Sequence, residues 1–141
     1  MLRVAFASTD RVKVNQHFGA AEGFAIFDIG TDSSALVAVG EFPQEAMDGH
    51  EGKLAAKVDF LAGCVAVYVQ AIGASAIKQL LAKGVQPIRV AETDDITELI
   101  QDVAGAMKEG GVPWIERALA QQAKAAASER FSEMEKEGWQ G

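Results

Sequence analysis

Apolar positions in the first third of the chain form short, β-capable runs separated by turn-forming residues. Three runs are expected to be strands, at residues 2–7, 24–29 and 35–42. The polar segment 30–34 between the second and third runs is typical of a hairpin connection. The first third therefore predicts an antiparallel meander.

The hydrophobic period changes after this meander. Leu54, Val58 and Leu61 follow helical spacing, and Gly63 stands where a helix is expected to end. The fully apolar run 64–69 then predicts a strand covered on both faces, as parallel strands commonly are.

The alternation of helix and strand continues to the end of the chain. Ser75 is expected to cap a helix that ends near Gly84, and residues 85–90 predict a parallel strand. The acidic segment 93–95 opens a further helix, and Pro113 opens the last one.

The predicted element order is βββαβαβα, followed by the last helix. This order indicates an α/β domain in which helices pack on a mixed sheet. We expect one domain over residues 1–128, which suits a chain of 141 residues. Residues 129–141 are acidic and weakly periodic, so they predict an exposed helix or a mobile tail.

The formal charge of −7 is concentrated in the last third of the chain. Residues 1–91 hold 8 Lys/Arg and 9 Asp/Glu, whereas residues 92–141 hold 5 and 11. An acidic surface argues against nucleic-acid binding, which depends on cations. An anionic ligand would be repelled least by the N-terminal part.

Two further totals bear on location. The single cysteine excludes an internal disulfide and fits a reducing compartment. The longest apolar run, residues 60–69, is half the length of a membrane span, and no secretory leader is recognisable at the start. We expect a cytoplasmic protein without a membrane segment.

The segment between the first two predicted strands holds the first candidate for chemistry. His17 lies there among polar residues, and imidazole is a metal ligand or proton carrier. Asn15 could orient it, and Gly19 permits close backbone approach. From the residues alone, a loop histidine packed by Phe18 is the alternative.

The remaining candidates are weaker. Cys64 could supply a thiolate to a soft metal, but a buried cysteine is the commoner outcome. His50 lies in an acidic loop whose spacing matches no standard metal site. Gly73 follows a strand and precedes a helix, where free amides form a modest anion site. No nucleotide, nucleophile-elbow or zinc-protease motif is present, so nothing requires an enzyme.

Taken in order, several segments resemble one family. VAFASTD at 4–10, VNQHFG at 14–19, GCVAVYVQAIG at 63–73 and PWIERAL at 113–119 are similar to the nitrogenase iron–molybdenum cofactor carriers of the NifX type. The similarity is collinear over residues 2–120.

The resemblance implies a ribonuclease-H-like fold and a carrier rather than an enzyme. The expected cargo is the iron–molybdenum cofactor or its iron–sulfur precursor, passed between cofactor-synthesis proteins and the nitrogenase apoenzyme. His17 occupies the family's motif histidine and Cys64 the cysteine of its GC segment, so both are implied as metal contacts. Asn15, Gly19 and Gly73 are expected around the cargo.

Two rival functions remain. One is a metal- or oxyanion-binding regulator that shares the domain but acts outside nitrogenase. The other is a metal-dependent nuclease, which rests on fold analogy alone. It would require Asp10, Asp28 and Asp59 to converge on two cations.

Overall fold

A computed structural model describes the backbone of residues 1–42 and 50–138 and the side chains of residues 1–42 and 54–128. One sheet contains the strands β1 (Leu2–Ala7), β2 (Gly23–Ile29), β3 (Ser34–Glu41), β4 (Ala66–Val69) and β5 (Gln86–Arg89). The helices of this part of the chain are α1 (His50–Phe60), α2 (Ala74–Ala82), α3 (Ile96–Glu109) and α4 (Pro113–Gly138).

The sheet is mixed, with β1 at its centre and the order β3-β2-β1-β4-β5. β1 pairs antiparallel with β2 and parallel with β4. β2 pairs antiparallel with β3, which confirms the predicted meander, and β4 pairs parallel with β5. The α/β class and the element order predicted from the sequence are therefore confirmed.

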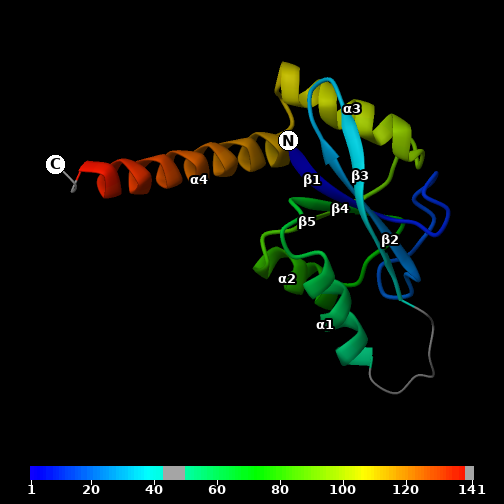
Figure 1. Ribbon diagram of the computed structural model, residues 1–141. Coiled ribbons are helices and arrows are strands. Elements are labelled where there is room, and N and C mark those ends of the chain that lie inside the picture. The colour runs from blue at the N-terminus through cyan, green and yellow to red at the C-terminus, as the bar shows by residue number, and fades with distance from the viewer. Residues whose placement is uncertain (43–49, 139–141) are drawn as a thin grey trace.

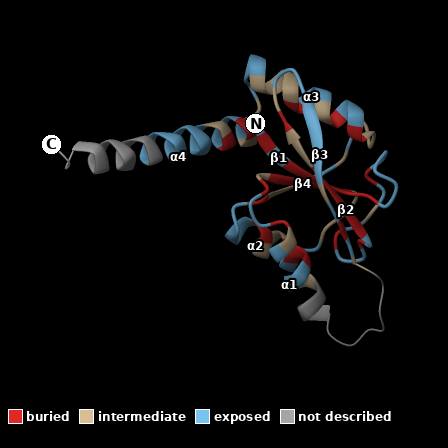
Figure 2. Ribbon diagram, viewed as in Figure 1, coloured by how far each residue is buried: buried red, intermediate tan, exposed pale blue. Residues whose placement is uncertain are grey.

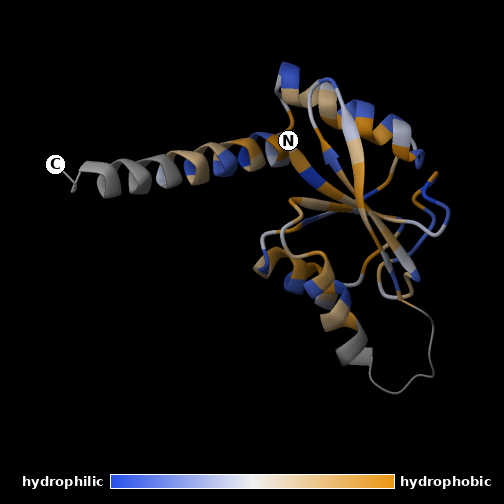
Figure 3. Cartoon of the chain, in the orientation of Figure 1, coloured by the Kyte–Doolittle hydropathy of each residue, from blue (hydrophilic) through white to orange (hydrophobic). Residues whose placement is uncertain are grey.

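Helices cover the two faces of the sheet (Figure 1). α1 and α2 lie on one face, and α3 with the first turns of α4 lies on the other. Alternation along β1 supplies both layers, because Ala5 and Ala7 face α1 and α2 while Val4 and Phe6 face α3. Figure 2 shows the buried residues along β1, β2 and β4, and Figure 3 shows the same strands as predominantly apolar.

Two local expectations are wrong. Ser75 does not cap α2, because the helix begins at Ala74 with Gly73 as N-cap and without any side-chain cap. β4 begins two residues later than expected, at Ala66. The reason is that the Cys64 amide donates to the Leu61 carbonyl at 3.0 Å, which continues the turn after α1 past Gly63.

α4 leaves the body of the protein after its first turns (Figure 1). Ile115 and Ala118 are buried, and the Gln122 side chain donates to the Met1 carbonyl, but residues 120–128 are exposed. The helix continues to Gly138, so the acidic tail predicted at 129–141 is helical over most of its length. Its separation from the domain remains a prediction. None of the described helices combines the length and apolarity needed to cross a bilayer.

Candidate functional site

The loop between β1 and β2 begins with a tight polar turn. The Ser8 side chain is buried, and its Oγ donates to Asp10 Oδ1 at 3.1 Å and accepts from the Arg11 amide at 2.9 Å. Asp10 Oδ1 also accepts from the amides of Val12 and Lys13, each at 2.9 Å. These backbone hydrogen bonds, with that of Lys13 the largest contributor, hold the pKa of the Asp10 carboxyl below its ordinary value.

Asn15 closes the same loop upon itself. Its Oδ1 accepts from the Thr9 amide at 3.1 Å, and its Nδ2 donates to Thr9 Oγ1 at 3.0 Å. Its backbone amide donates to the Ala7 carbonyl at 3.1 Å. The Asn15 side chain therefore fixes the shape of the loop, and its polar atoms are engaged with Thr9.

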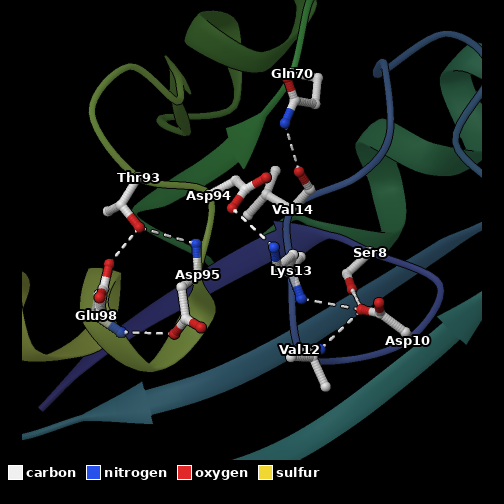
Figure 4. A network of polar contacts seen from close by, with 10 residues as sticks. All are labelled: Ser8, Asp10, Val12, Lys13, Val14, Gln70, Thr93, Asp94, Asp95 and Glu98. Atoms are coloured by element: carbon white, nitrogen blue, oxygen red, sulfur yellow. Dashed lines mark hydrogen bonds and ion pairs between the residues drawn. The ribbon is translucent and has the colours of Figure 1, made fainter.

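The loop is also tied to the segment that precedes α3 (Figure 4). The Val14 amide donates to the Asp94 carbonyl at 2.8 Å, and Lys13 Nζ lies 3.9 Å from Asp94 Oδ1. Asp95 caps α3 by accepting from the Glu98 amide at 3.1 Å. Gln70 holds the other side, because its Nε2 donates to the Val14 carbonyl at 2.7 Å.

His17 lies where this loop runs beside the end of β4. The Gln16 carbonyl accepts from the Gln70 amide at 2.9 Å, and the Phe18 amide donates to the Ala71 carbonyl at 2.8 Å. Phe18 is fully buried, whereas His17 is exposed. The backbone on both sides of His17 is thus fixed while its imidazole is open to solvent. The structure therefore does not show the alternative, a histidine packed by Phe18.

Two glycines flank this position. Gly19 and Gly73 are both exposed, and an added Cβ at either one would meet no heavy atom within 4 Å. Gly73 lies two residues after Ala71, which is bonded to the loop, and it opens α2 without a side-chain cap. Free amides at such a helix start favour an anion. The structure therefore brings Asn15, His17, Gly19 and Gly73 to one end of the sheet.

A shallow hollow of about 310 Å³ lies on the other side of the same loop, against β2 and β3. Its lining combines one cation, Arg11, with two carboxylates, Glu22 and Glu41. Ser8, Thr9, Gly23, Val39 and Gly40 complete it. His17 does not line this hollow, and its mixed charge favours no particular ion.

Cys64 lies at the opposite end of the sheet from His17. Val65, the next residue, donates to the carbonyl of Arg3 at the start of β1, whereas the His17 loop meets the chain at Ala71. At about 3.3 Å per residue, the run from Cys64 to Ala71 spans roughly 20 Å. The two residues implied as metal contacts therefore cannot reach the same metal ion in this fold.

The surroundings of Cys64 are those of a core residue. Its side chain is 4% exposed and packs with Val58 and Leu61. Burial raises the pKa of the Cys64 thiol to about 11, so the thiol is protonated at neutral pH. A thiolate ligand would require the core to open at this position.

No group of three or more metal-capable side chains occurs among the described residues. His50 begins α1, but its side chain and those of its acidic neighbours lie outside the described residues. Asp10 follows the end of β1, whereas Asp28 is paired with Arg3 at the other end, with Nε to Oδ1 at 2.9 Å. Two of the three carboxylates of the nuclease alternative, Asp10 and Asp28, are therefore separated by the length of β1.

Sequence reasoning missed Lys57, which reaches this loop from α1. Its Nζ donates to the Gly19 carbonyl at 2.9 Å and lies 3.5 Å from the Phe18 carbonyl. The side chain is only 5% exposed. A signal was present in the spacing, because Lys57 falls between Leu54 and Leu61 on the apolar side of the helix.

A comparison with known families decides the identity of the domain. Residues 1–106 match the family model described as "Dinitrogenase iron-molybdenum cofactor". The chain belongs to this family. The family resemblance seen in the sequence is therefore confirmed. The assignment of the chain to nitrogen fixation and iron–molybdenum cofactor biosynthesis is confirmed as well.

Individual relatives extend the match beyond the family model. The chain is 48% identical to "Protein NifX" of Azotobacter vinelandii over 139 residues, which cover 99% of this chain and 87% of the relative. It is 30% identical to "Protein NifX" of Herbaspirillum seropedicae, with 84% and 82% covered. Among solved structures, "Crystal structure of PH0822" is similar with a TM-score of 0.58 and 26% identity, covering 74% of this chain and 90% of that one.

Proposed function

We propose that this protein binds the iron–molybdenum cofactor or its iron–sulfur precursor and delivers it during nitrogenase assembly. The observation that carries the proposal is His17, an exposed imidazole on a backbone fixed on both sides by hydrogen bonds to Gln70 and Ala71. Imidazole is a good ligand for iron-group metals. A cluster that contains iron and molybdenum offers metal atoms to which an imidazole can bind. The family and its NifX-type relatives support the choice of cargo.

The surroundings of His17 suit reversible holding. One imidazole and neighbouring backbone amides provide few attachment points, so the cargo can leave again. A set of several cysteines would bind a cluster far more firmly. We therefore propose a carrier rather than an enzyme, with cofactor-synthesis proteins as donors, the nitrogenase apoenzyme as acceptor and the cytoplasm as the place of work.

We propose His17 as the metal contact, with Asn15, Gly19 and Gly73 shaping its surroundings. Cys64 has no place in this site, because it lies at the other end of β4 and is buried. We also propose the ribonuclease-H-like assignment for the fold. The order β3-β2-β1-β4-β5, with β2 antiparallel to both of its neighbours, supports it.

Anaerobic titration of the purified protein with isolated iron–molybdenum cofactor tests the proposal. Loss of a contact near a metal typically lowers affinity on the order of 10–100-fold, and we expect a loss of this size for His17→Ala. Its unfolding temperature should match that of the wild type, because the side chain is exposed.

Cys64→Ala is the matched variant for this titration. It removes the other metal-capable side chain implied by the family, and we expect it to lower stability but to retain cofactor affinity. Unchanged affinity in His17→Ala, or loss of affinity in Cys64→Ala alone, would contradict the assignment of the site. Wild-type protein that binds no cofactor would contradict the function itself.

A further inference from the structure

Among the residues whose side chains the structure describes, the one buried charged residue is Lys57, at 5% exposure. Burying an ammonium group is costly unless hydrogen bonds and charge compensation offset the loss of water. Among its contacts are the carbonyls of Phe18 and Gly19, at 3.5 and 2.9 Å. Lys57 belongs to α1 and these carbonyls belong to the His17 loop, so a helix on one face of the sheet holds the loop at its end.

The two carbonyls lie in a turn that follows His17 directly. The Ala21 amide donates to the Phe18 carbonyl at 3.2 Å, which leaves Gly19 and Ala20 as the central residues of the turn. Both are exposed. The turn therefore presents its two central residues to solvent beside the imidazole.

The orientation of the carbonyls determines where the amides point. In a planar trans peptide the C=O and the following N–H point in opposite directions. Because the Phe18 and Gly19 carbonyls are directed inward to Lys57, the Gly19 and Ala20 amides are directed outward. Within the described part of the chain, neither amide donates a hydrogen bond. Successive free amides of this kind form a concave site for an anion.

We propose that Lys57 is a positioning residue that orients the Gly19 and Ala20 amides as an anion-binding pair beside His17. The imidazole then contacts a metal of the cargo, while the two amides receive an anionic sulfur or oxygen atom next to it. This inference rests on the proposed function, since it assigns the second contact of the same site.

Three variants separate positioning from simple stability. Lys57→Met keeps the length of the side chain but removes the ammonium, whereas Lys57→Arg keeps a charged donor. Lys78→Met removes the same charge from an exposed position on α2 and is the matched control. Each full-length protein is examined by thermal unfolding, by ¹⁵N-resolved NMR of the Gly19 and Ala20 amides without cargo, and by anaerobic titration with isolated cofactor.

In folded Lys57→Met, we expect the Gly19 and Ala20 amide resonances to shift or broaden and cofactor affinity to fall on the order of tenfold. Lys57→Arg should recover most of this affinity, and Lys78→Met should match the wild type. A folded Lys57→Met with unchanged amide resonances, or with unchanged affinity, overturns the inference.

A second measurement covers the case in which Lys57→Met does not fold. Wild-type protein is titrated with isolated cofactor, and the Gly19 and Ala20 amide resonances should be the first to be lost through relaxation by the cluster, together with that of His17. Cofactor binding that leaves these two amides unaffected overturns the anion pair. Wild-type protein that binds no cofactor contradicts the proposed function instead, and where Lys57→Met folds, its apo NMR comparison with the wild type still decides whether Lys57 orients the turn.

Discussion

Side chains in the loop between β1 and β2 have two different tasks. The polar side-chain atoms of Ser8, Asp10 and Asn15 bond to one another, to loop backbone or to Thr9, so they determine the path of the chain. His17 is exposed on a backbone that these contacts and the end of β4 hold in place. A metal-binding side chain on a fixed backbone loses little conformational entropy when it binds its cargo. Specific binding is therefore favoured even with few protein ligands.

Lys57 and Cys64 are both buried, but their surroundings differ. The Lys57 side chain is buried, and the backbone carbonyls of Phe18 and Gly19 accept hydrogen bonds from its Nζ. Cys64 is surrounded by apolar side chains, and its raised pKa favours the neutral thiol. The sequence offered both His17 and Cys64 as metal contacts, whereas the environment in the fold favours the His17 loop.

Gly19 provides a test of close approach by the cargo. Its φ is not in the left-handed region and its Cβ position is open, so Gly19→Ala should leave the free energy of unfolding within about 0.5 kcal/mol. A methyl group at the contact surface should cost about 1.4 kcal/mol of binding, which is a tenfold loss of cofactor affinity. Anaerobic titration and urea unfolding measure the two effects.

Gly105→Ala is the control for this substitution, because Gly105 also has open space around its Cβ position and lies on α3. We expect wild-type affinity in that variant. Equal affinity in Gly19→Ala would show that the cargo does not approach the turn closely.

At the scale of elements, β3 is the edge strand on the meander side and exposes Leu36, Val37 and Val39. Such an apolar edge invites pairing with another chain. A β-bulge interrupts it, because Ala38 pairs with Ile26 and Leu36 with Phe27, which leaves Val37 without a partner on β2. Bulges twist an edge strand and so discourage further pairing.

α4 combines a docked beginning with an exposed continuation. Trp114 packs edge-on against Tyr68 with ring centroids 6.4 Å apart, and Ile115 is 2% exposed. Ile115→Ala should therefore lower the free energy of unfolding by about 2–4 kcal/mol. Removal of residues 129–141 should change it by less than about 0.5 kcal/mol and leave cofactor binding intact.

Urea unfolding of the two variants beside the wild type checks this prediction. A loss of several kcal/mol on truncation would show that the last segment contributes to the core. In that case the division between the domain at 1–128 and the tail at 129–141 would be wrong.

At the scale of the whole molecule, charges and buried polar groups determine how stability depends on pH. Hydrogen bonds lower the pKa of Asp10, and the Arg3 side chain does the same for Asp28. A carboxyl with a depressed folded-state pKa adds stability above its unfolded pKa and loses it as pH falls through the folded value. Both groups therefore contribute at neutral pH and cease to do so in acid.

Cys64 and Tyr68 affect the free energy of unfolding at alkaline pH. Burial raises their pKa values to about 11 and about 12, so the folded state retains these protons more strongly than the unfolded state. The stability from each group is complete below its unfolded pKa and is lost as pH rises through the folded value. The free energy of unfolding should therefore fall above about pH 9.

The substitution Cys64→Ala isolates the contribution of the cysteine to this loss of stability at alkaline pH. Between pH 7 and about pH 10.5, wild-type protein should lose about 2 kcal/mol more than Cys64→Ala, as the linkage of a thiol raised from 9.0 to about 11 requires. Urea unfolding at the two pH values measures this difference. Equal losses in both proteins would mean that the thiol ionises in the folded state as readily as in the unfolded one.

The sequence by itself determined the elements and the family. Periodicity located each strand and helix to within a few residues, because the apolar period follows from local geometry. The motif around His17 identified the loop that carries the proposed site. Expectations failed where one contact decides the outcome, as at Ser75, where α2 begins two residues too early for its hydroxyl to cap the helix.

Only the tertiary structure decided which residues act together. β1 and β4 are parallel neighbours, so the chain that follows β1 meets the chain that follows β4, and His17 comes to lie beside Ala71 and Gly73. The same pairing places Cys64 beside Arg3 at the other end, although the motif containing Cys64 also contains Gly73. Lys57 reached Gly19 across 38 residues of chain. Strand order and direction determine such neighbours, and neither is encoded in the local period of a sequence.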